Sequence, residues 1–190
     1  MARAEPGGAP PRLTLVSGPA RSGKSRWAEH LAATSGRRVV YLATGPRRPH
    51  DPSWQERVAR HRRRRPTGWT CREVGGCLAE ALPALDDDQF ALVDSLGTWV
   101  AAHLELGLPE WERQLRDLLA AVEDCPAQVL LVCEETGWGV VPPTELGGRF
   151  RDRLGELQQR LLGRCDAAWL VLQGRAVDLL AISHPVPPAP

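Results

Sequence analysis

Short runs of apolar residues recur along the chain, and longer segments with helical periodicity lie between them. The runs are almost continuously apolar, which is typical of strands that are covered on both faces. Strands are predicted at residues 12–17, 38–43, 90–94, 128–133 and 167–173. Helices are predicted at residues 25–33, 54–63, 96–106, 110–123 and 146–162. In the helix at 110–123, one face carries Leu115, Leu118, Leu119 and Val122.

Strands and helices alternate along the sequence, which predicts an α/β fold with a doubly wound, mostly parallel sheet and helices on both faces. Such sheets bind ligands at the carboxyl ends of their strands. The 190 residues are enough for one domain of this kind, which is expected at residues 12–183. Residues 1–11 are expected to form a flexible N-terminal tail. Residues 184–190 are expected to form a proline-rich C-terminal tail, because proline continues neither a helix nor a central strand.

The composition excludes several classes of function. The formal net charge is +1, so no field of the whole molecule attracts nucleic acid or an anionic membrane. No apolar run reaches the about 18 residues of a membrane-spanning helix. The N-terminus lacks the apolar core of a signal peptide, and we therefore expect a cytoplasmic protein. The five cysteines contain no C-x-x-C pair, so reduced, buried thiols are expected rather than disulfides or a zinc site.

The stretch GPARSGKS at residues 18–25 matches the phosphate-binding pattern G-x-x-x-x-G-K-[ST]. A strand is predicted directly before it and a helix directly after it, which is the context that the pattern requires. The glycines let successive N–H groups point inward, and the start of the helix adds positive charge, so the fold is expected to be P-loop NTPase-like. Lys24, the only lysine of the chain, is expected to contact the β and γ phosphates. The predicted nucleotide-binding residues of this loop are Gly18, Pro19, Ala20, Arg21, Ser22, Gly23, Lys24 and Ser25.

Asp94 is the last residue of the strand predicted at 90–94, and it is expected at the same sheet edge as the phosphate-binding loop. A P-loop enzyme needs an acidic residue near the loop to hold Mg²⁺. The predicted Mg²⁺ ligands are the Ser25 hydroxyl and the Asp94 carboxylate, with ATP or GTP as the bound nucleotide. The alternative for Asp94 is an aspartate that starts a turn.

The stretch RVARHRRRRP at residues 57–66 places His61 among arginines. A nucleophilic imidazole has to be neutral, and its ordinary pKa is about 6.5. The neighbouring arginines disfavour a second positive charge on the ring, and the same guanidinium groups can bind a triphosphate and a departing pyrophosphate. A solvated basic helix end with an incidental histidine is the alternative, which spacing alone does not exclude.

From residue 13 to about residue 174, the chain resembles the bifunctional adenosylcobinamide kinase and adenosylcobinamide-phosphate guanylyltransferase family of cobalamin biosynthesis. The matching stretches follow the order of the family: SGPARSGKSRWAE (17–29), YLAT (41–44), RVARHRRRRPTGWTCRE (57–73), LVDSLGTWV (92–100), EETGWGVVP (134–142) and RFRDRLGELQQRLL (149–162). The chain departs from the family pattern at several positions, among them His103, where members often have asparagine, and residues 50–54, where an acidic stretch is reduced. Arg60 stands where members often have the first of two adjacent histidines, and Glu134 stands where asparagine is usual.

The resemblance implies two reactions. The first phosphorylates adenosylcobinamide with ATP or GTP, and the second transfers GMP from GTP to adenosylcobinamide phosphate through a GMP-histidine, giving adenosylcobinamide-GDP and pyrophosphate. His61 matches the family nucleophile, so His61 and Lys24 are the predicted catalytic residues. A homo-oligomer, possibly a trimer, is also implied. The further predicted nucleotide-binding residues are Ala43, Thr44, Gly45, Arg62, Arg63, Arg64, Arg65, Glu73, Asp94 and Glu135.

Three alternatives remain from the residues themselves. The first is a P-loop small-molecule kinase without guanylyltransferase activity, and the second is an NTPase that needs no corrinoid. The third is a nucleic-acid-binding module that uses the arginines at 60–65. No nucleic-acid partner is expected, because one basic turn lacks the aromatic platform on which single strands stack.

Overall fold

The structure is a computed structural model that describes residues 10–46, 50–139 and 141–187. The strands are β1 (Leu13–Gly18), β2 (Arg38–Ala43), β3 (Thr70–Glu73), β4 (Gln89–Asp94), β5 (Gln128–Glu134), β6 (Ala167–Leu172) and β7 (Arg175–Asp178). The helices are α1 (Lys24–Thr34), α2 (Pro52–Arg64), α3 (Leu78–Ala81), α4 (Leu96–Ala102), α5 (Leu108–Asp124), α6 (Glu145–Leu162) and α7 (Leu179–Ile182). Residues 1–9 and 188–190, which make up much of the two predicted tails, lie outside the described residues.

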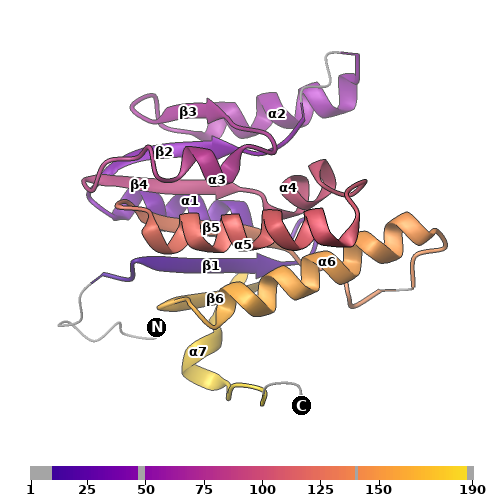
Figure 1. Ribbon diagram of the computed structural model, residues 1–190. Helices are drawn as coiled ribbons and strands as arrows, with labels where there is room; N and C mark the ends of the chain where they lie inside the picture. The colour runs from indigo at the N-terminus through magenta and orange to yellow at the C-terminus, as the bar shows by residue number, and fades with distance from the viewer. Residues whose placement is uncertain (1–9, 47–49, 140, 188–190) are drawn as a thin grey trace.

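Within the described residues, seven strands form one sheet in the order β3-β2-β4-β5-β1-β6-β7 (Figure 1). The strand pairs are parallel except for β6 and β7, which pair as an antiparallel hairpin. Because β1, β4 and β5 are parallel neighbours, the residues that follow them meet at one edge of the sheet. This edge carries the candidate site.

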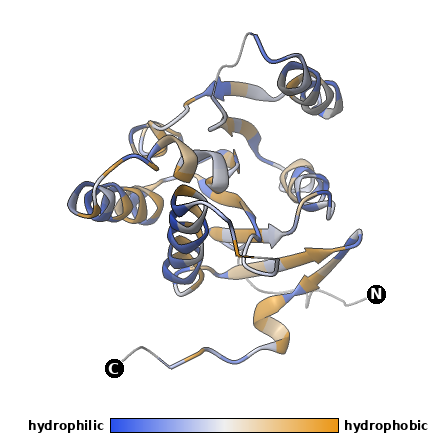
Figure 2. Ribbon diagram, turned by 90° about the vertical axis from the view of Figure 1, so that its right-hand side faces the viewer, coloured by the Kyte–Doolittle hydropathy of each residue, from blue (hydrophilic) through white to orange (hydrophobic). Residues whose placement is uncertain are grey.

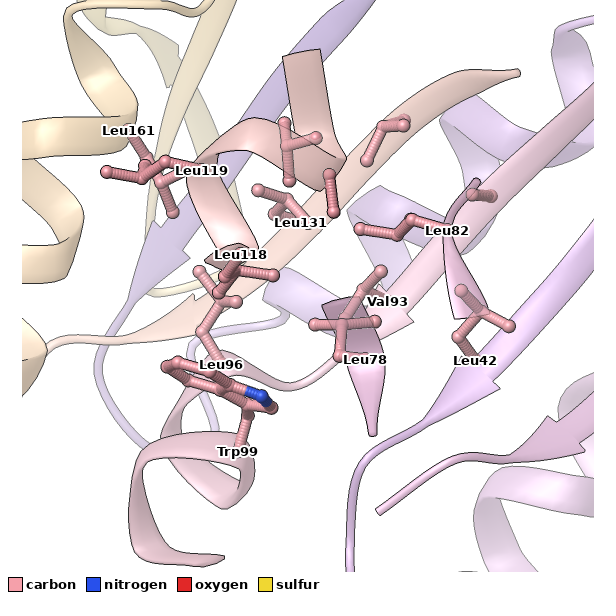
Figure 3. Packing of buried hydrophobic residues seen from close by; sticks show 14 of the residues in the cluster. Leu42, Leu78, Leu82, Val93, Leu96, Trp99, Leu118, Leu119, Leu131 and Leu161 are labelled. Atoms are coloured by element: carbon pink, nitrogen blue, oxygen red, sulfur yellow. The ribbon is translucent and has the colours of Figure 1, made fainter. Parts of the chain in front are cut away.

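Two hydrophobic clusters cover the two faces of the sheet. The larger cluster joins strand residues such as Leu42, Val93 and Leu131 to helices α3, α4, α5 and α6, and Figure 3 shows its packing around Trp99. The smaller cluster joins the opposite face to Ala28 of α1. Figure 1 shows α1 behind the sheet and α5 in front of it, and Figure 2 shows hydrophobic residues gathered along the strands. The predicted α/β class, with helices on both faces, is therefore confirmed.

The five predicted strands are present, with ends that differ by at most one residue. The prediction missed β3 and β7, the two edge strands. Both are four residues long, and β3 is exposed along its whole length, so neither has the apolar run by which buried strands are recognised. The helix predicted at 96–106 was too long, because α4 ends at Ala102.

The buried side chain of Arg153 binds the backbone where α4 ends. Its Nη1 donates to the carbonyl oxygen of His103 at 2.9 Å, and its Nη2 donates to that of Leu106 at 2.7 Å. The guanidinium carbon also lies 4.8 Å from the centre of the Trp111 ring. Arg153 thus satisfies carbonyl groups that a longer helix would have used, and burial lowers its pKa from the ordinary value.

The cysteine prediction was partly wrong. All five cysteines are free, and Cys125 and Cys133 are buried as expected. Cys71 and Cys77 are exposed, because Cys71 lies on the exposed edge strand β3 and Cys77 directly precedes α3. Two of the tryptophans, Trp99 and Trp111, are buried in the core, whereas Trp138 is 63% exposed. None of the helices in the described part of the chain is long and apolar enough to span a bilayer.

Candidate active site

The loop between β1 and α1 depends on its two glycines. Gly23 caps α1 with φ at 105°, a left-handed conformation that side chains other than glycine rarely adopt. At Gly18, a Cβ atom would overlap the carbonyl oxygen of Val171 in β6 and would lie 2.8 Å from Ser22 Oγ. The sequence pattern therefore matches a loop that is closely packed against its neighbouring strand.

Replacing Gly18 with alanine is expected to lower the free energy of unfolding by about 1–3 kcal/mol, because the backbone of β6 has to move away from the new methyl group. The matched control is Gly155→Ala, where a Cβ meets no atom of the described residues within 4 Å. Because Gly155 lies inside α6, its replacement is expected to stabilise the protein by about 0.5–1 kcal/mol. Urea unfolding of the two variants measures both values. Equal stability of Gly18→Ala and the unchanged protein would contradict the close contact.

The side chain of Lys24 extends back over the glycine loop that precedes α1. Its side chain is buried, and Nζ donates a hydrogen bond to the carbonyl oxygen of Pro19 at 3.3 Å. Its backbone N–H donates to Ser22 Oγ at 3.3 Å, and Ser25 follows in the first turn of α1. The ammonium group is thus held at the mouth of the glycine loop, beside the positive end of the helix. An anion bound in the loop would therefore contact both the ammonium group and the positive end of the helix.

Asp94 is placed by the alternation of side chains along β4. It follows Phe90 and Leu92 at a spacing of two residues, so its side chain points to the same face of the strand. Phe90 and Leu92 pack in the cluster that includes α1. Asp94 therefore lies on the face of the sheet that carries α1, the helix whose first residues are Lys24 and Ser25.

The carboxylate of Asp94 accepts a hydrogen bond from Tyr41. The Tyr41 hydroxyl donates to Asp94 Oδ2 at 2.9 Å from the neighbouring strand β2. Burial raises the pKa of Tyr41 well above its ordinary value, and the negative charge of Asp94 raises this pKa further. The phenol is therefore protonated at neutral pH and acts as the donor. No local sequence pattern indicates this contact, because the position of Tyr41 predicts only a core residue of a strand.

The oxygen donors at this edge fit Mg²⁺. This ion is usually held by one or two carboxylates together with waters and the phosphates of a substrate. The Ser25 hydroxyl and the Asp94 carboxylate are hard oxygen donors, and both lie on the α1 side of the edge. No group of three or more histidine, cysteine, aspartate or glutamate side chains in the described ranges forms a metal site by itself.

A buried polar network joins the ends of β2, β4 and β5. Thr44 Oγ1 donates to the carbonyl oxygen of Ser95 at 2.6 Å and accepts from the Ser95 N–H at 2.8 Å. From the other side, Glu134 Oε1 accepts from Ser95 Oγ at 2.6 Å, and Oε2 accepts from the Gly97 N–H at 2.9 Å. Thr44, predicted as a nucleotide contact, is almost fully buried in this network, while Ala43 and Gly45 beside it are half-buried.

Glu135 also lies at this edge. Its backbone N–H donates to the carbonyl oxygen of Gly18 at 3.0 Å, which ties the end of β5 to the start of the glycine loop. Its Oε1 accepts a hydrogen bond from Gln158 of α6 at 2.9 Å. The structure therefore brings Glu135 close to the loop and gives its side chain a partner on α6.

The arginine-rich stretch forms the second half of α2 and lies beside β3, at the end of the sheet (Figure 1). Arg62 Nη2 donates to Glu73 Oε1 at 2.6 Å, so two predicted nucleotide-binding residues pair with each other. Arg65 follows the helix, and its guanidinium carbon lies 3.4 Å from the centre of the Tyr41 ring. Arg63 is exposed. The side chains of Arg60, His61 and Arg64 lie outside the described part of the structure.

Two pockets lie near these elements. A pocket of about 540 Å³ lies between the end of α2 and strand β3. Its lining residues include Arg62, Arg65, Trp69 and Glu73. A pocket of about 850 Å³ lies between the segment before α5 and the start of α6, with Trp111 among its residues. The smaller pocket is the one that contains predicted site residues.

The parallel sheet, the glycine loop between β1 and α1, and the acidic end of β4 define a P-loop NTPase fold. A solved ATPase, described as prototypical and taken from the type III secretion system of pathogenic bacteria, superposes with a TM-score of 0.54 over 83% of this chain at 11% identity. The chain spans half of that ATPase, and the likeness concerns the fold alone.

The chain belongs to the cobinamide kinase / cobinamide phosphate guanyltransferase family, whose model matches residues 14–179. It is 38% identical to the bifunctional adenosylcobalamin biosynthesis protein CobP of Pseudomonas aeruginosa, over 87% of this chain and 95% of that protein. It is 34% identical to the bifunctional adenosylcobalamin biosynthesis protein CobU of Escherichia coli K12 and 36% identical to that of Salmonella typhimurium. Each of these two matches covers 88% of this chain and 99% of the relative. The resemblance seen in the sequence is confirmed.

Proposed function

We propose that this protein phosphorylates adenosylcobinamide with ATP or GTP and then transfers GMP from GTP to adenosylcobinamide phosphate. The products are adenosylcobinamide-GDP and pyrophosphate. The observation that carries the proposal is membership of the family over residues 14–179, in a chain that spans nearly the full length of its curated bifunctional relatives. The Lys24 ammonium held at the mouth of a glycine loop supports the nucleotide-dependent part of the chemistry.

In the kinase step, the loop at residues 18–25 binds the triphosphate through backbone N–H groups, and Lys24 stabilises the charge on the β and γ phosphates. Ser25 and Asp94 would hold Mg²⁺, which would neutralise negative charge on the phosphate oxygens. The hydroxyl of adenosylcobinamide attacks the γ phosphorus and releases its proton to solvent. The bond from this phosphorus to the β–γ bridging oxygen breaks, and the nucleoside diphosphate leaves with the electron pair. We also assign nucleotide contacts to Ala43 and Gly45, which are half-buried at the end of β2.

In the guanylyltransferase step, a nitrogen of His61 attacks the α phosphorus of GTP. The bond from this phosphorus to the α–β bridging oxygen breaks, and pyrophosphate leaves with the electron pair. An oxygen of adenosylcobinamide phosphate then attacks the same phosphorus, and the bond to nitrogen breaks, which restores His61. We assign the binding of the triphosphate and pyrophosphate to Arg62, Arg63, Arg64 and Arg65.

Glu73 and Glu135 are proposed as further nucleotide-binding residues. A carboxylate can accept hydrogen bonds from N1–H and the amino group of guanine, or it can bind Mg²⁺. The position of Glu73 in the pocket beside Arg62 and Arg65 supports a role in guanosine nucleotide recognition. We also infer a homo-oligomer, with a trimer as the expected state, and a location in the cytoplasm, where both nucleoside triphosphates are available.

The proposal is tested by incubating the protein with Mg²⁺, adenosylcobinamide and GTP that is labelled either in the α or in the γ phosphate. Label from the γ position is expected in adenosylcobinamide phosphate and, after the second step, in adenosylcobinamide-GDP, whereas label from the α position is expected only in adenosylcobinamide-GDP. Label transfer from the γ position alone would identify a kinase without guanylyltransferase activity. Release of labelled inorganic phosphate with no labelled corrinoid would identify an NTPase and contradict the proposal.

A further inference from the structure

Tyr41 is a buried polar residue whose hydroxyl reaches the candidate site. It lies in β2, is 2% exposed, and is opposite Leu92 of β4. Its hydroxyl extends along the strand to Asp94 Oδ2, two residues beyond Leu92. Phenylalanine would fill the same space in a hydrophobic core without a polar atom to satisfy. The hydroxyl is therefore best explained by its hydrogen bond to Asp94, which fixes one oxygen of the carboxylate and so the rotation of the group.

Arg65 covers the ring of the same tyrosine. Its guanidinium carbon is 3.4 Å from the ring centre, which is the geometry of a close cation–π contact. Among the described residues, Nη1 of this guanidinium lies 3.3 Å from Cys71 Sγ, and the buried Nε has no hydrogen-bond partner. The stacking on Tyr41 is therefore a defined contact of this guanidinium within the described part of the chain. Arg65 directly follows α2, the helix that contains His61.

These contacts form a continuous chain from the end of α2, through Arg65 and the Tyr41 ring, to the carboxylate of Asp94. The chain crosses two strands, β2 and β4, and it joins the helix of the proposed nucleophile to the proposed Mg²⁺ ligand. Groups that hydrogen-bond a metal ligand orient it, and their removal typically weakens metal affinity. A movement of α2 would therefore change the position of the Asp94 carboxylate through Arg65 and Tyr41.

We propose that Tyr41 is a positioning residue that orients Asp94 for Mg²⁺, and that Arg65 couples this orientation to the end of α2. The inference rests on the proposed function, in which Asp94 binds Mg²⁺. In this proposal, the Mg²⁺-dependent binding of nucleotide at the glycine loop depends on Tyr41, which contacts neither the nucleotide nor the ion.

The experiment is titration calorimetry with a GTP analogue that carries a methylene group between the α and β phosphates, which blocks transfer of GMP. Binding is measured over a series of Mg²⁺ concentrations and in EDTA. For Tyr41→Phe, the Mg²⁺ concentration at half-maximal enhancement of binding is expected to rise about tenfold. Affinity in EDTA is expected to stay within about twofold, because the hydroxyl acts only through the metal ligand. An unchanged Mg²⁺ midpoint, or an equal loss of affinity in EDTA, would overturn the positioning role.

The link to α2 is tested by Arg65→Ala and by the double variant. Arg65→Ala is expected to raise the same Mg²⁺ midpoint about threefold, and adding it to Tyr41→Phe is expected to raise the midpoint no further. A double variant in which the two effects multiply would overturn the coupling. The matched control is Arg38→Ala at the start of the same strand, where the arginine pairs with Asp86 and Asp88, and its Mg²⁺ midpoint is expected to be unchanged.

Asp94→Asn separates this inference from the proposed function. If Asp94→Asn raises the Mg²⁺ midpoint and Tyr41→Phe does not, the positioning role fails while Asp94 remains the Mg²⁺ ligand. If Asp94→Asn also leaves the midpoint unchanged, the assignment of Asp94 fails, and the inference about Tyr41 fails with it. Thermal unfolding of each variant without ligand verifies that the compared proteins are folded.

Discussion

Replacing Lys24 with alanine is expected to lower the rate of adenosylcobinamide phosphorylation at least about a hundredfold, because phosphoryl transfer relies on positioning and charge stabilisation. The ammonium group lies at the mouth of the glycine loop, where Nζ is 3.3 Å from the carbonyl oxygen of Pro19. Alanine removes the cation and leaves the backbone of α1 in place. The measurement is the initial rate with γ-labelled ATP or GTP at saturating adenosylcobinamide.

Two control variants sharpen this result. Lys24→Arg keeps the positive charge, but it is expected not to restore the rate, because a planar guanidinium does not fit the space of a buried ammonium group. Arg116→Ala removes a cation from the exposed side of α5 and is expected to leave the rate unchanged. A folded Lys24→Ala protein with a rate close to that of the unchanged protein would remove the assignment of the loop as the kinase site.

The central strands were predictable because burial on both faces forces their sequences to be almost continuously apolar. β4 and β5 are examples, since each is flanked by parallel strands and covered by helices. The edge strands β3 and β7 carry no such constraint, because one side of each has no neighbouring strand within the described part of the chain. The end of α4 was not predictable either, because it depends on Arg153, which lies about fifty residues further along the chain.

The candidate site also contains some residues that the sequence predicts and others that it does not. The glycine loop was predictable because its chemistry lies within eight consecutive residues, 18–25. Asp94 was predictable because a strand that ends in a carboxylate places the group at the ligand-binding edge. The contact of Tyr41 with Asp94 depends on the pairing of β2 with β4, which no local pattern encodes. Its partner Arg65 was predicted only as a phosphate ligand, and its stacking on Tyr41 was missed.

The carboxylate of Glu134, at the end of β5, has a defined role in the structure. Its two oxygens accept from Ser95 Oγ and from the N–H of Gly97, so the residue caps the start of α4. A Cβ at Gly97 would overlap this carboxylate, so a larger residue there would displace the end of the Glu134 side chain. Ser95 directly follows Asp94, and Glu134 thus helps to fix the strand end that carries the proposed Mg²⁺ ligand.

His61→Ala is expected to abolish guanylyl transfer while keeping most of the kinase activity. If His61 is the nucleophile, α-labelled GTP with Mg²⁺ should leave one GMP on the unchanged protein, and γ-labelled GTP should leave no label. The bond should be labile in acid and stable in base, as expected of a phosphorus–nitrogen bond. The variant should take up no GMP, but its kinase rate should stay within about threefold, because the hydroxyl nucleophile of that step belongs to the corrinoid.

The matched control for this prediction is His50→Ala, which removes an exposed histidine from the segment just before α2. This variant is expected to retain the GMP label, because the side chain has no assigned role in either reaction. Both variants keep the arginines at the end of α2, so a difference between them reports on the histidine and not on the basic charge. Uptake of GMP by a folded His61→Ala protein would refute the assignment of the nucleophile. Loss of label together with loss of kinase activity would instead indicate that His61 supports a step that the two reactions share.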